Sequence, residues 1–301
     1  MEQSKLLTRR IWRWSKMNEL LPRLPFADWI DNGVDWLVAT FGSLLDGIAS
    51  VLGGVVEGAV NILQVVPSIL LAIIFAVIAY FISTRKIAFF TLIGLLFIDY
   101  LGYWYPMLQM LALVLTSVFF AVVIGIPIGI WGSQKARVRK VVNPILDLMQ
   151  TMPAFVYLIP AIFFFNIGVV PGVVASVIFA MPPTIRLTML GIEQVPKDLI
   201  EATEAFGSTT GQRLMKIQIP LAKPTIMAGV NQSIMLALSM VVIASMVGAP
   251  GLGEEVYRSV TQLKTGVGVE TGVSIVIVAI ILDRITQQAG TRKKKIGGKL
   301  V

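Results

Sequence analysis

Uncharged stretches long enough to cross a lipid bilayer constrain this chain more than any other feature of its sequence. From Leu148 to Ile185 there is no Asp, Glu, Lys or Arg. A membrane-crossing helix needs about 20 predominantly apolar residues, so this stretch exceeds one crossing, and residues 166–172 supply a turn in its middle. Of the 301 residues, 56% are hydrophobic and only 14% are charged, which is too little charge to cover a water-soluble domain. We therefore expect an all-α integral membrane protein.

The same criterion predicts seven membrane helices after the first 66 residues. A polar segment separates the fifth from the sixth, and a Gly-rich loop over 248–268 separates the sixth from the seventh. If the clusters of Lys and Arg are placed on the cytoplasmic side, the loops between these helices alternate correctly between the two sides of the membrane. The expected ranges are 67–83, 87–104, 107–131, 145–165, 170–187, 225–248 and 268–286.

The first 66 residues admit two interpretations. Asp35, Asp46 and Glu57 follow one another at intervals of eleven residues, close to three helical turns, so they share one face of a helix. This spacing favours an amphipathic helix that lies in the membrane interface. The alternative is a further crossing over about 37–60, which the basic N-terminus favours because a cytoplasmic tail needs that extra crossing. Seven or eight crossings are expected.

The composition excludes several classes of function. With no Cys and no His, the chain has no disulfide, no zinc site built on these ligands and no His-based general base. No Gly-x-x-x-x-Gly-Lys-Ser/Thr motif occurs, so we do not expect the chain to hydrolyse ATP. The net charge of +8 is divided among clusters that apolar stretches separate, a pattern typical of membrane anchors and not of a nucleic-acid interface. We expect no catalytic residue, no metal and no nucleic-acid partner.

The polar segment over 193–224, called the polar loop below, carries the most specific pattern. Residues 196–206 are predicted as a helix with acids in its first turns, and Gly207 as its C-terminal cap. Ser208 or Thr209 is expected to begin a second short helix, which Pro220 helps to end. Two short helices at a sharp angle form a compact cytoplasmic knob.

The residue order in the polar loop resembles the EAA loop of importer-type ATP-binding-cassette (ABC) permeases. That pattern reads Glu-Ala-Ala, three residues, Gly, nine residues, Ile, any residue, Leu-Pro; here Thr203 replaces the second Ala and Ile219 the Leu. The resemblance implies that the loop docks into a cleft of a separate ATPase subunit. The residues assigned to coupling are Glu201, Ala202, Glu204, Ala205, Phe206, Gly207, Arg213, Ile217 and Pro220.

Residues from about 92 to 287 resemble the permease of glycine betaine and proline betaine importers. The runs 147–160, 181–188 and 247–253 carry this resemblance. It implies a type I ABC importer transmembrane domain with a five-helix core preceded by accessory helices. The expected organisation is a basic and amphipathic segment (1–66), accessory helices (67–105), the permease core (106–288) and a basic cytoplasmic tail (289–301).

The resemblance implies ATP-dependent uptake of glycine betaine or a related osmoprotectant across the inner membrane. ATP and Mg would bind to the partner ATPase, and this chain would bind no cofactor. A separate extracytoplasmic binding protein would deliver the solute, and two copies of the chain would enclose the pathway within the lipid. The same type of ABC permease for another solute, such as choline, carnitine or an amino acid, is an open alternative. An ATP-independent secondary transporter is a more distant alternative, because ion-coordinating charges near mid-membrane are missing.

A quaternary ammonium binds to aromatic faces through cation–π attraction, which makes Phe155 and Tyr157 candidates for the translocation pathway. For both aromatic residues, packing against lipid or other helices is the simpler interpretation. Polar candidates on the sixth predicted helix are Asn231, Ser233 and Ser239. Asp283 beside Arg284 is expected to form an interfacial ion pair.

Overall fold

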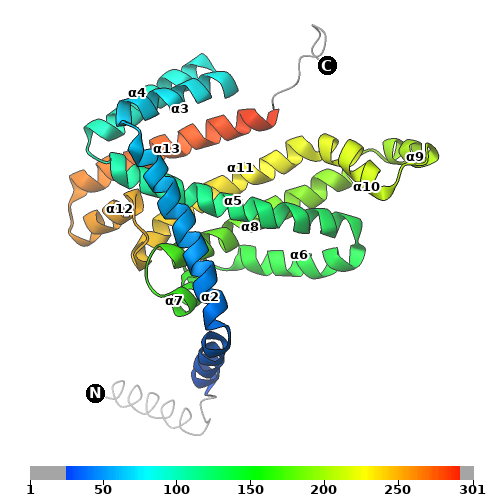
Figure 1. Ribbon diagram of the computed structural model, residues 1–301, viewed down its shortest axis with the longest axis horizontal. Helices are drawn as coiled ribbons and strands as arrows, with labels where there is room; N and C mark the ends of the chain where they lie inside the picture. Colours follow the sequence, from blue (N-terminus) through cyan, green and yellow to red (C-terminus); the bar gives the residue numbers. More distant parts are fainter. Residues whose placement is uncertain (1–24, 292–301) are drawn as a thin grey trace, which may run out of the picture. The chain divides into compact units, whose positions relative to one another are not determined.

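The computed structural model describes residues 25–291, and every regular element in that range is a helix (Figure 1). The basic N-terminal residues and the tail after Thr291 lie outside the described residues. The helices are α2 (Phe26–Val65), α3 (Ser68–Ile82), α4 (Arg85–Tyr100), α5 (Trp104–Gln134), α6 (Ala136–Thr151), α7 (Leu158–Phe165), α8 (Val169–Glu193), α9 (Lys197–Ala205), α10 (Thr210–Arg213), α11 (Ile219–Ala244), α12 (Leu252–Thr261) and α13 (Thr265–Thr291). Shorter turns are η1 (Ala154–Tyr157), η2 (Leu214–Gln218) and η3 (Ser245–Val247).

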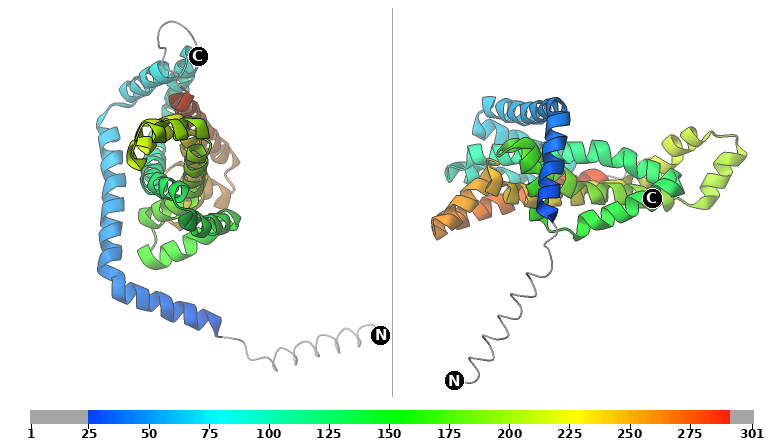
Figure 2. Two further views of the ribbon diagram at one scale, coloured as in Figure 1. Left: turned by 90° about the vertical axis from the view of Figure 1, so that its right-hand side faces the viewer. Right: turned by 90° about the horizontal axis from the view of Figure 1, so that it is seen from below.

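The described chain divides between Leu45 and Asp46 into two separate compact units, and α2 crosses their boundary. In the first unit, α2 carries mostly exposed apolar side chains, and the rings of Trp36 and Phe41 meet edge to face with centroids 6.4 Å apart. The packing of α3 to α13 lies entirely within the second unit. Within that unit, α9 and α10 project at one end and α12 lies at the other (Figures 1 and 2).

Glycines bring the three central helices α5, α8 and α11 into close contact. A Cβ atom added to Gly129 of α5 would lie 2.6 Å from the Thr188 Cβ and 2.8 Å from the Ile185 carbonyl oxygen of α8. On the other side of α8, a Cβ at Gly229 of α11 would lie 3.0 Å from the Pro183 carbonyl oxygen. Small residues let helix backbones approach closely in a membrane, where packing replaces the hydrophobic effect as the driving force. The contacts at Gly129 and Gly229 therefore leave no room for a larger residue.

The predicted helix over 145–165 is wrong, because the chain breaks there. α6 ends at Thr151, and the segment 154–165 continues at an angle of 112° to it. Pro153 lies at the break and lacks the amide hydrogen that would continue the helix, while Met152 before it is extended with ψ 134°. The pair forms either one broken span or a re-entrant loop.

The loop predicted over 248–268 is also wrong in its middle, where α12 forms. The glycines that suggested a loop act at its start, since Gly248 and Gly251 have φ of +88° and +124°, values that favour glycine. Beyond them, Glu254 in the first turn of α12 forms an ion pair with Arg258, in which a guanidinium nitrogen lies 2.9 Å from a carboxylate oxygen. Acid near the N-terminus and base near the C-terminus complement the helix dipole.

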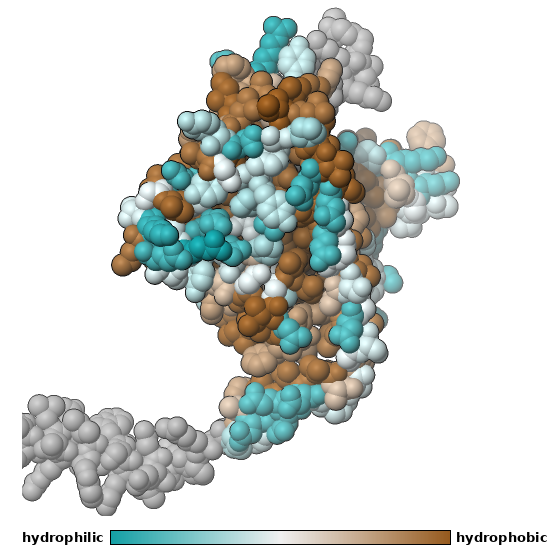
Figure 3. Space-filling model, turned by 60° about the vertical axis from the view of Figure 1, so that its left-hand side comes forward, coloured by the Kyte–Doolittle hydropathy of each residue, from teal (hydrophilic) through white to brown (hydrophobic). Residues whose placement is uncertain are grey.

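Within the described residues, five helices are long and apolar enough to cross a membrane, and the bent pair would make a sixth. α2 is one of the five, so both interpretations of the N-terminal segment stay open. α3 and α4 have 15 and 16 residues, which span roughly 22 to 24 Å, less than the hydrocarbon core of about 30 Å. The expected seven or eight crossings therefore stay a prediction. Apolar side chains cover much of the face seen in Figure 3, as contact with lipid requires.

We predict that Gly129→Ala lowers the stability of the protein by about 1–3 kcal/mol, the usual cost of overpacking, because the Thr188 side chain and the Ile185 carbonyl leave no room for a methyl group. Thermal unfolding of the purified protein in detergent measures the change.

Gly272→Ala on α13 is the matched control, since nothing lies within 4 Å of its added Cβ. The control is expected to be neutral or to stabilise by up to about 1 kcal/mol through helix propensity. Equal effects of the two substitutions would contradict the close approach of α5 and α8.

Candidate functional site

The first arm of the polar loop folds as its sequence predicts. α9 follows Pro196, ends at Ala205 with Phe206 as its C-cap, and is followed by a turn at Gly207, whose φ is +75°. Such a left-handed residue after a helix satisfies orphan carbonyls at no steric cost when it is glycine. The predicted helix and its glycine turn are confirmed.

The second arm begins with a capping box. The Thr209 hydroxyl accepts a hydrogen bond from the Gln212 amide at 3.3 Å, and the Thr209 amide donates to the Gln212 side-chain oxygen at 3.0 Å. Of the two starts predicted for the second helix, Thr209 is the one observed.

The expected end of the second arm at Pro220 is wrong. α10 passes through the π-helical turn η2 into α11, so that 210–247 is a single helical stretch of 38 residues. A proline inside an α-helix clashes with the carbonyl four residues earlier, which here belongs to Lys216 in the π-helical turn. The wider turn accommodates Pro220, and the helix that was expected to begin near residue 225 begins in the polar loop itself.

An ion pair holds the two arms of the polar loop together. The Arg213 guanidinium on α10 contacts the Glu204 carboxylate on α9, so the structure brings these two predicted residues side by side. No residue between 25 and 291 pairs with the carboxylate of Glu201, which is exposed. Phe206 is 90% exposed at the turn, so its ring is accessible to another protein.

The remaining predicted residues of the loop differ in their exposure. Ala202, Ala205, Gly207 and Pro220 are exposed, whereas Ile217 is half-buried. The loop therefore presents α9 and the glycine turn outward and rests on the base of α11.

Ser233 packs between helices instead of lining an open space. Its hydroxyl lies 2.7 Å from the Thr184 hydroxyl and donates to the Ala180 carbonyl. Ser233 and Thr184 are both fully buried. The pair joins α11 to α8, and sequence reasoning did not identify Thr184.

Asn231 joins α11 to α13. Its side-chain amide donates to the Asp283 carboxylate at 3.1 Å, and its oxygen accepts from the Thr286 hydroxyl. Gln287 donates to the same Asp283 oxygen at 2.6 Å, and the Arg284 Nε lies 3.9 Å from the other oxygen. The expected pair of Asp283 and Arg284 is confirmed as one part of a larger polar cluster. The spacing of 283, 286 and 287 on one helix face was the signal available in the sequence.

The other three pathway candidates do not share one environment. Tyr157 is buried, donates to the Met149 carbonyl and packs edge to face on Phe179 with centroids 5.7 Å apart. Phe155 is 49% exposed, and Ser239 is exposed on α11 with its hydroxyl on the Met235 carbonyl. The five candidates thus divide into an exposed pair and three residues engaged between elements of the chain.

We predict an energetic coupling between Ser233 and Thr184, because removing one hydroxyl leaves the other buried with fewer partners. A double-mutant cycle with Ser233→Ala and Thr184→Val, read by reversible unfolding, is expected to give about 0.6 kcal/mol and at most about 1.7 kcal/mol, the range for such bonds in membranes.

Ser239→Ala combined with Thr184→Val serves as the control cycle, since Ser239 bonds only within its own helix. Additive effects for Ser233 and Thr184, together with altered transport in Ser233→Ala, would assign Ser233 to the pathway instead.

The chain was compared with known protein families, proteins and solved structures. Residues 125–292, which include the polar loop, match the family described as "binding-protein-dependent transport system inner membrane component". The glycine betaine transport system permease protein OpuAB of Bacillus subtilis is 73% identical over 277 residues, which cover 92% of this chain and 98% of that protein. The glycine betaine/carnitine transport permease protein GbuB of Listeria monocytogenes is 51% identical, covering 91% and 98%.

A third relative, the glycine betaine/proline betaine transport system permease protein ProW of Escherichia coli, is 48% identical over 92% of this chain and 78% of that protein. Among solved structures, an inward-facing form of the MetNI methionine ABC transporter superposes with a TM-score of 0.56 at 26% identity. That match covers 61% of this chain and 93% of the transporter chain.

Proposed function

This chain belongs to the inner membrane components of binding-protein-dependent transport systems, the permeases of ABC importers, and we propose that the solute it moves is glycine betaine. The sequence runs 147–160, 181–188 and 247–253 first suggested this solute. The identity of 73% to a permease named for glycine betaine is the observation that carries the proposal. Carnitine is the second candidate, because the name of the relative at 51% identity includes it.

We propose that the polar loop docks into a separate ATPase subunit. Phe206 and the outer face of α9 are exposed at one end of the 46–301 unit, where a partner protein reaches them (Figure 2). The ion pair between Arg213 and Glu204 keeps the two arms of the loop as one rigid body. Glu201 has an exposed carboxylate and supplies a charge for a basic residue of the partner.

The unbroken helical stretch from Thr210 to Val247 supports a direct mechanical link. A displacement of the loop moves α11, and α11 is bound to α8 through Ser233 and to α13 through Asn231. Binding of ATP and Mg to the partner shifts the equilibrium between pathway states only by its differential affinity for them. Hydrolysis and both ligands belong to the partner in this proposal.

Two copies of the chain would supply the two loops that a dimeric ATPase needs. The extracytoplasmic binding protein would dock at the end of the unit that carries α12, opposite the polar loop (Figure 1). Lipid would cover the exposed apolar faces.

Reconstitution of the chain with its ATPase and binding protein in liposomes tests the proposal. Uptake of labelled glycine betaine is expected to require ATP on the side of the ATPase. Glu201→Arg is expected to abolish both uptake and the stimulation of ATPase activity by loaded binding protein, because it places a cation where the partner's basic residue lies.

Asp198→Arg on the same helix is the matched control, since it reverses a charge at an exposed position outside the EAA pattern. Stimulation of the ATPase without uptake of glycine betaine would support an ABC importer that carries a different solute. Uptake driven by an ion gradient with no ATPase present would overturn the proposal.

The exposed pathway candidates are tested by labelling, which the absence of native Cys makes direct. If Ser239 faces the aqueous pathway, Ser239→Cys is expected to react with a membrane-impermeant trimethylammonium thiosulfonate, and excess glycine betaine is expected to slow the reaction. A thiol facing hydrocarbon does not ionise and reacts slowly.

Val123→Cys on α5 is the control, because Val123 is an exposed apolar residue of a membrane helix. Equal reactivity at both positions, or none at Ser239→Cys in either the resting or the ATP-bound complex, would remove Ser239 from the pathway.

A further inference from the structure

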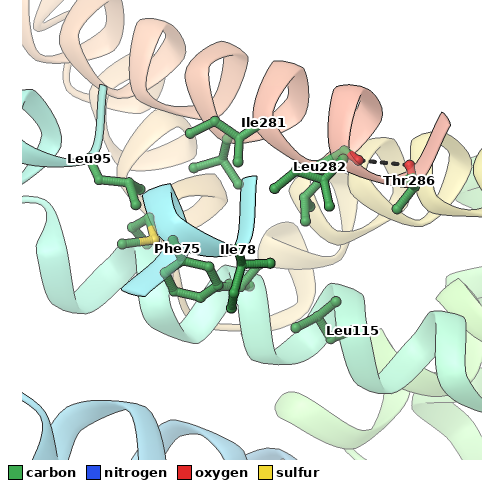
Figure 4. A pocket seen from close by; sticks show the side chains of 11 residues that line it. Phe75, Ile78, Leu95, Leu115, Ile281, Leu282 and Thr286 are labelled. Atoms are coloured by element: carbon green, nitrogen blue, oxygen red, sulfur yellow. Dashed lines mark hydrogen bonds between the residues drawn. The ribbon is translucent and has the colours of Figure 1, made fainter. Parts of the chain in front are cut away.

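A cavity of about 210 Å³ lies among α3, α4, α5 and α13 (Figure 4). Its floor consists of buried apolar side chains, including Leu95 of α4, Leu111 of α5 and Ile281 of α13. Ile78 of α3 and Leu115 of α5 also line it and are 40% and 44% exposed, so the cavity opens between these two helices.

The lining excludes water and polar solutes. Thr286 is the one polar residue among those that line the cavity. Its hydroxyl already lies within hydrogen-bond distance of the Asn231 side chain and of the Leu282 carbonyl at 2.7 Å. A buried water needs two to four polar partners, and a zwitterion needs more. The cavity therefore suits hydrocarbon only.

The size of the cavity also favours an occupant. An engineered apolar cavity of roughly 150 Å³ stays dry and binds benzene, and this one is larger. Left empty, its lining loses the dispersion contacts of a packed interior. About one helical turn from Ile78 and from Leu115, the exposed side chains of Ile74 on α3 and Phe119 on α5 are apolar, as side chains that face lipid are.

α3, α4 and the turn between them form the α3–α4 hairpin. Two cationic side chains lie at its turn, and the cavity extends toward that end of the hairpin. α4 and α13 run in opposite directions (Figure 1), and a Cβ at Gly94 of α4 would meet Ile277 of α13. Arg85 at the start of α4 and Thr286 near the end of α13 therefore lie toward the same end of the two helices. Arg85 and Lys86 are both exposed.

These two cations occupy the first turn of α4, where the helix dipole is itself positive. An anion at this position relieves the repulsion and accepts hydrogen bonds from the helix N-terminus. The Ser83 hydroxyl at the same turn has no hydrogen-bond partner among residues 25–291. Ile78 lies about 6 Å of helix rise before Ile82, the last residue of α3, and Arg85 begins α4 after the two-residue turn that follows.

We infer that this cavity is a phospholipid site: one acyl chain enters between Ile78 and Leu115, and the phosphate of the same lipid rests on Arg85 and Lys86. The lipid fills the space across which α3 would otherwise contact α5, and it fastens the α3–α4 hairpin to the permease core. The site does not depend on the solute or on the ATPase.

Photocrosslinking tests the site in the full-length chain. The protein is reconstituted in phosphatidylcholine vesicles that contain a phosphatidylcholine with a diazirine in its acyl chain, irradiated and mapped by peptide mass spectrometry. Adducts are expected to concentrate in residues 75–78, 111–115 and 281–286, three segments that a single chain in the cavity touches.

Leu115→Trp closes the mouth and is expected to abolish most of these adducts, whereas Val123→Trp, a little over two turns further along α5 and outside the lining, is expected to leave them unchanged. Arg85→Gln with Lys86→Gln is expected to reduce adducts at the three segments and to leave labelling of the exposed Val123 region of α5 intact. Ile78→Trp closes the opposite rim and replaces Leu115→Trp if that variant does not insert.

Three outcomes overturn the inference. Labelling spread evenly over all exposed apolar faces would show ordinary contact with bulk lipid. Unchanged adducts in both rim variants would place the lipid elsewhere. An absence of adducts at the three segments in the unaltered protein would show that protein, such as a second copy, fills the cavity.

Discussion

The close approach of α5, α8 and α11 is the constraint on which the rest of the structure depends. Gly129 and Gly229 place the three backbones in direct contact, and Thr184, Thr188 and Ser233 occupy the small spaces that remain. In a bilayer there is no hydrophobic gain from bringing apolar helices together, so packing and hydrogen bonds decide which helices meet. The polar loop and α13 are attached to this central layer through α11.

The continuity of α10 with α11 determines how the polar loop acts on that layer. A loop joined by a flexible connection transmits little motion, but here the π-helical turn at 214–218 carries the helix past Pro220 without a break. π-helical turns are frequent at functional sites. Asn231 and Ser233 then connect the same helix to α13 and α8, so the helix that leaves the loop is bound to both neighbours.

The α3–α4 hairpin stands in a different relation to the core. α4 touches α13 closely at Gly94, whereas α3 and α5 both line the cavity. The hairpin packs fully against the core only when hydrocarbon fills this apolar cavity, and in a membrane the hydrocarbon comes from lipid acyl chains. The hairpin thus adds a lipid-dependent element to a core that is otherwise held by direct contact.

The sequence by itself determined the features that depend on neighbouring residues. The apolar stretches predicted most of the membrane helices, and the order Glu201, Gly207, Thr209 predicted the first arm, the turn and the start of the second arm, because caps and turns involve residues a few positions apart. The family resemblance and the expected importer function also came from local order.

Only the tertiary structure decided how distant residues meet. Ser233 and Thr184 are separated by 49 positions, and no local pattern distinguishes a serine that binds a neighbouring helix from one that faces a solute. The proline at 153 breaks a helix while Pro220 does not, because the surrounding turns differ. The cavity beside α3 exists because four helices fail to fill the space between them, which depends on their placement and not on the residues of any one of them.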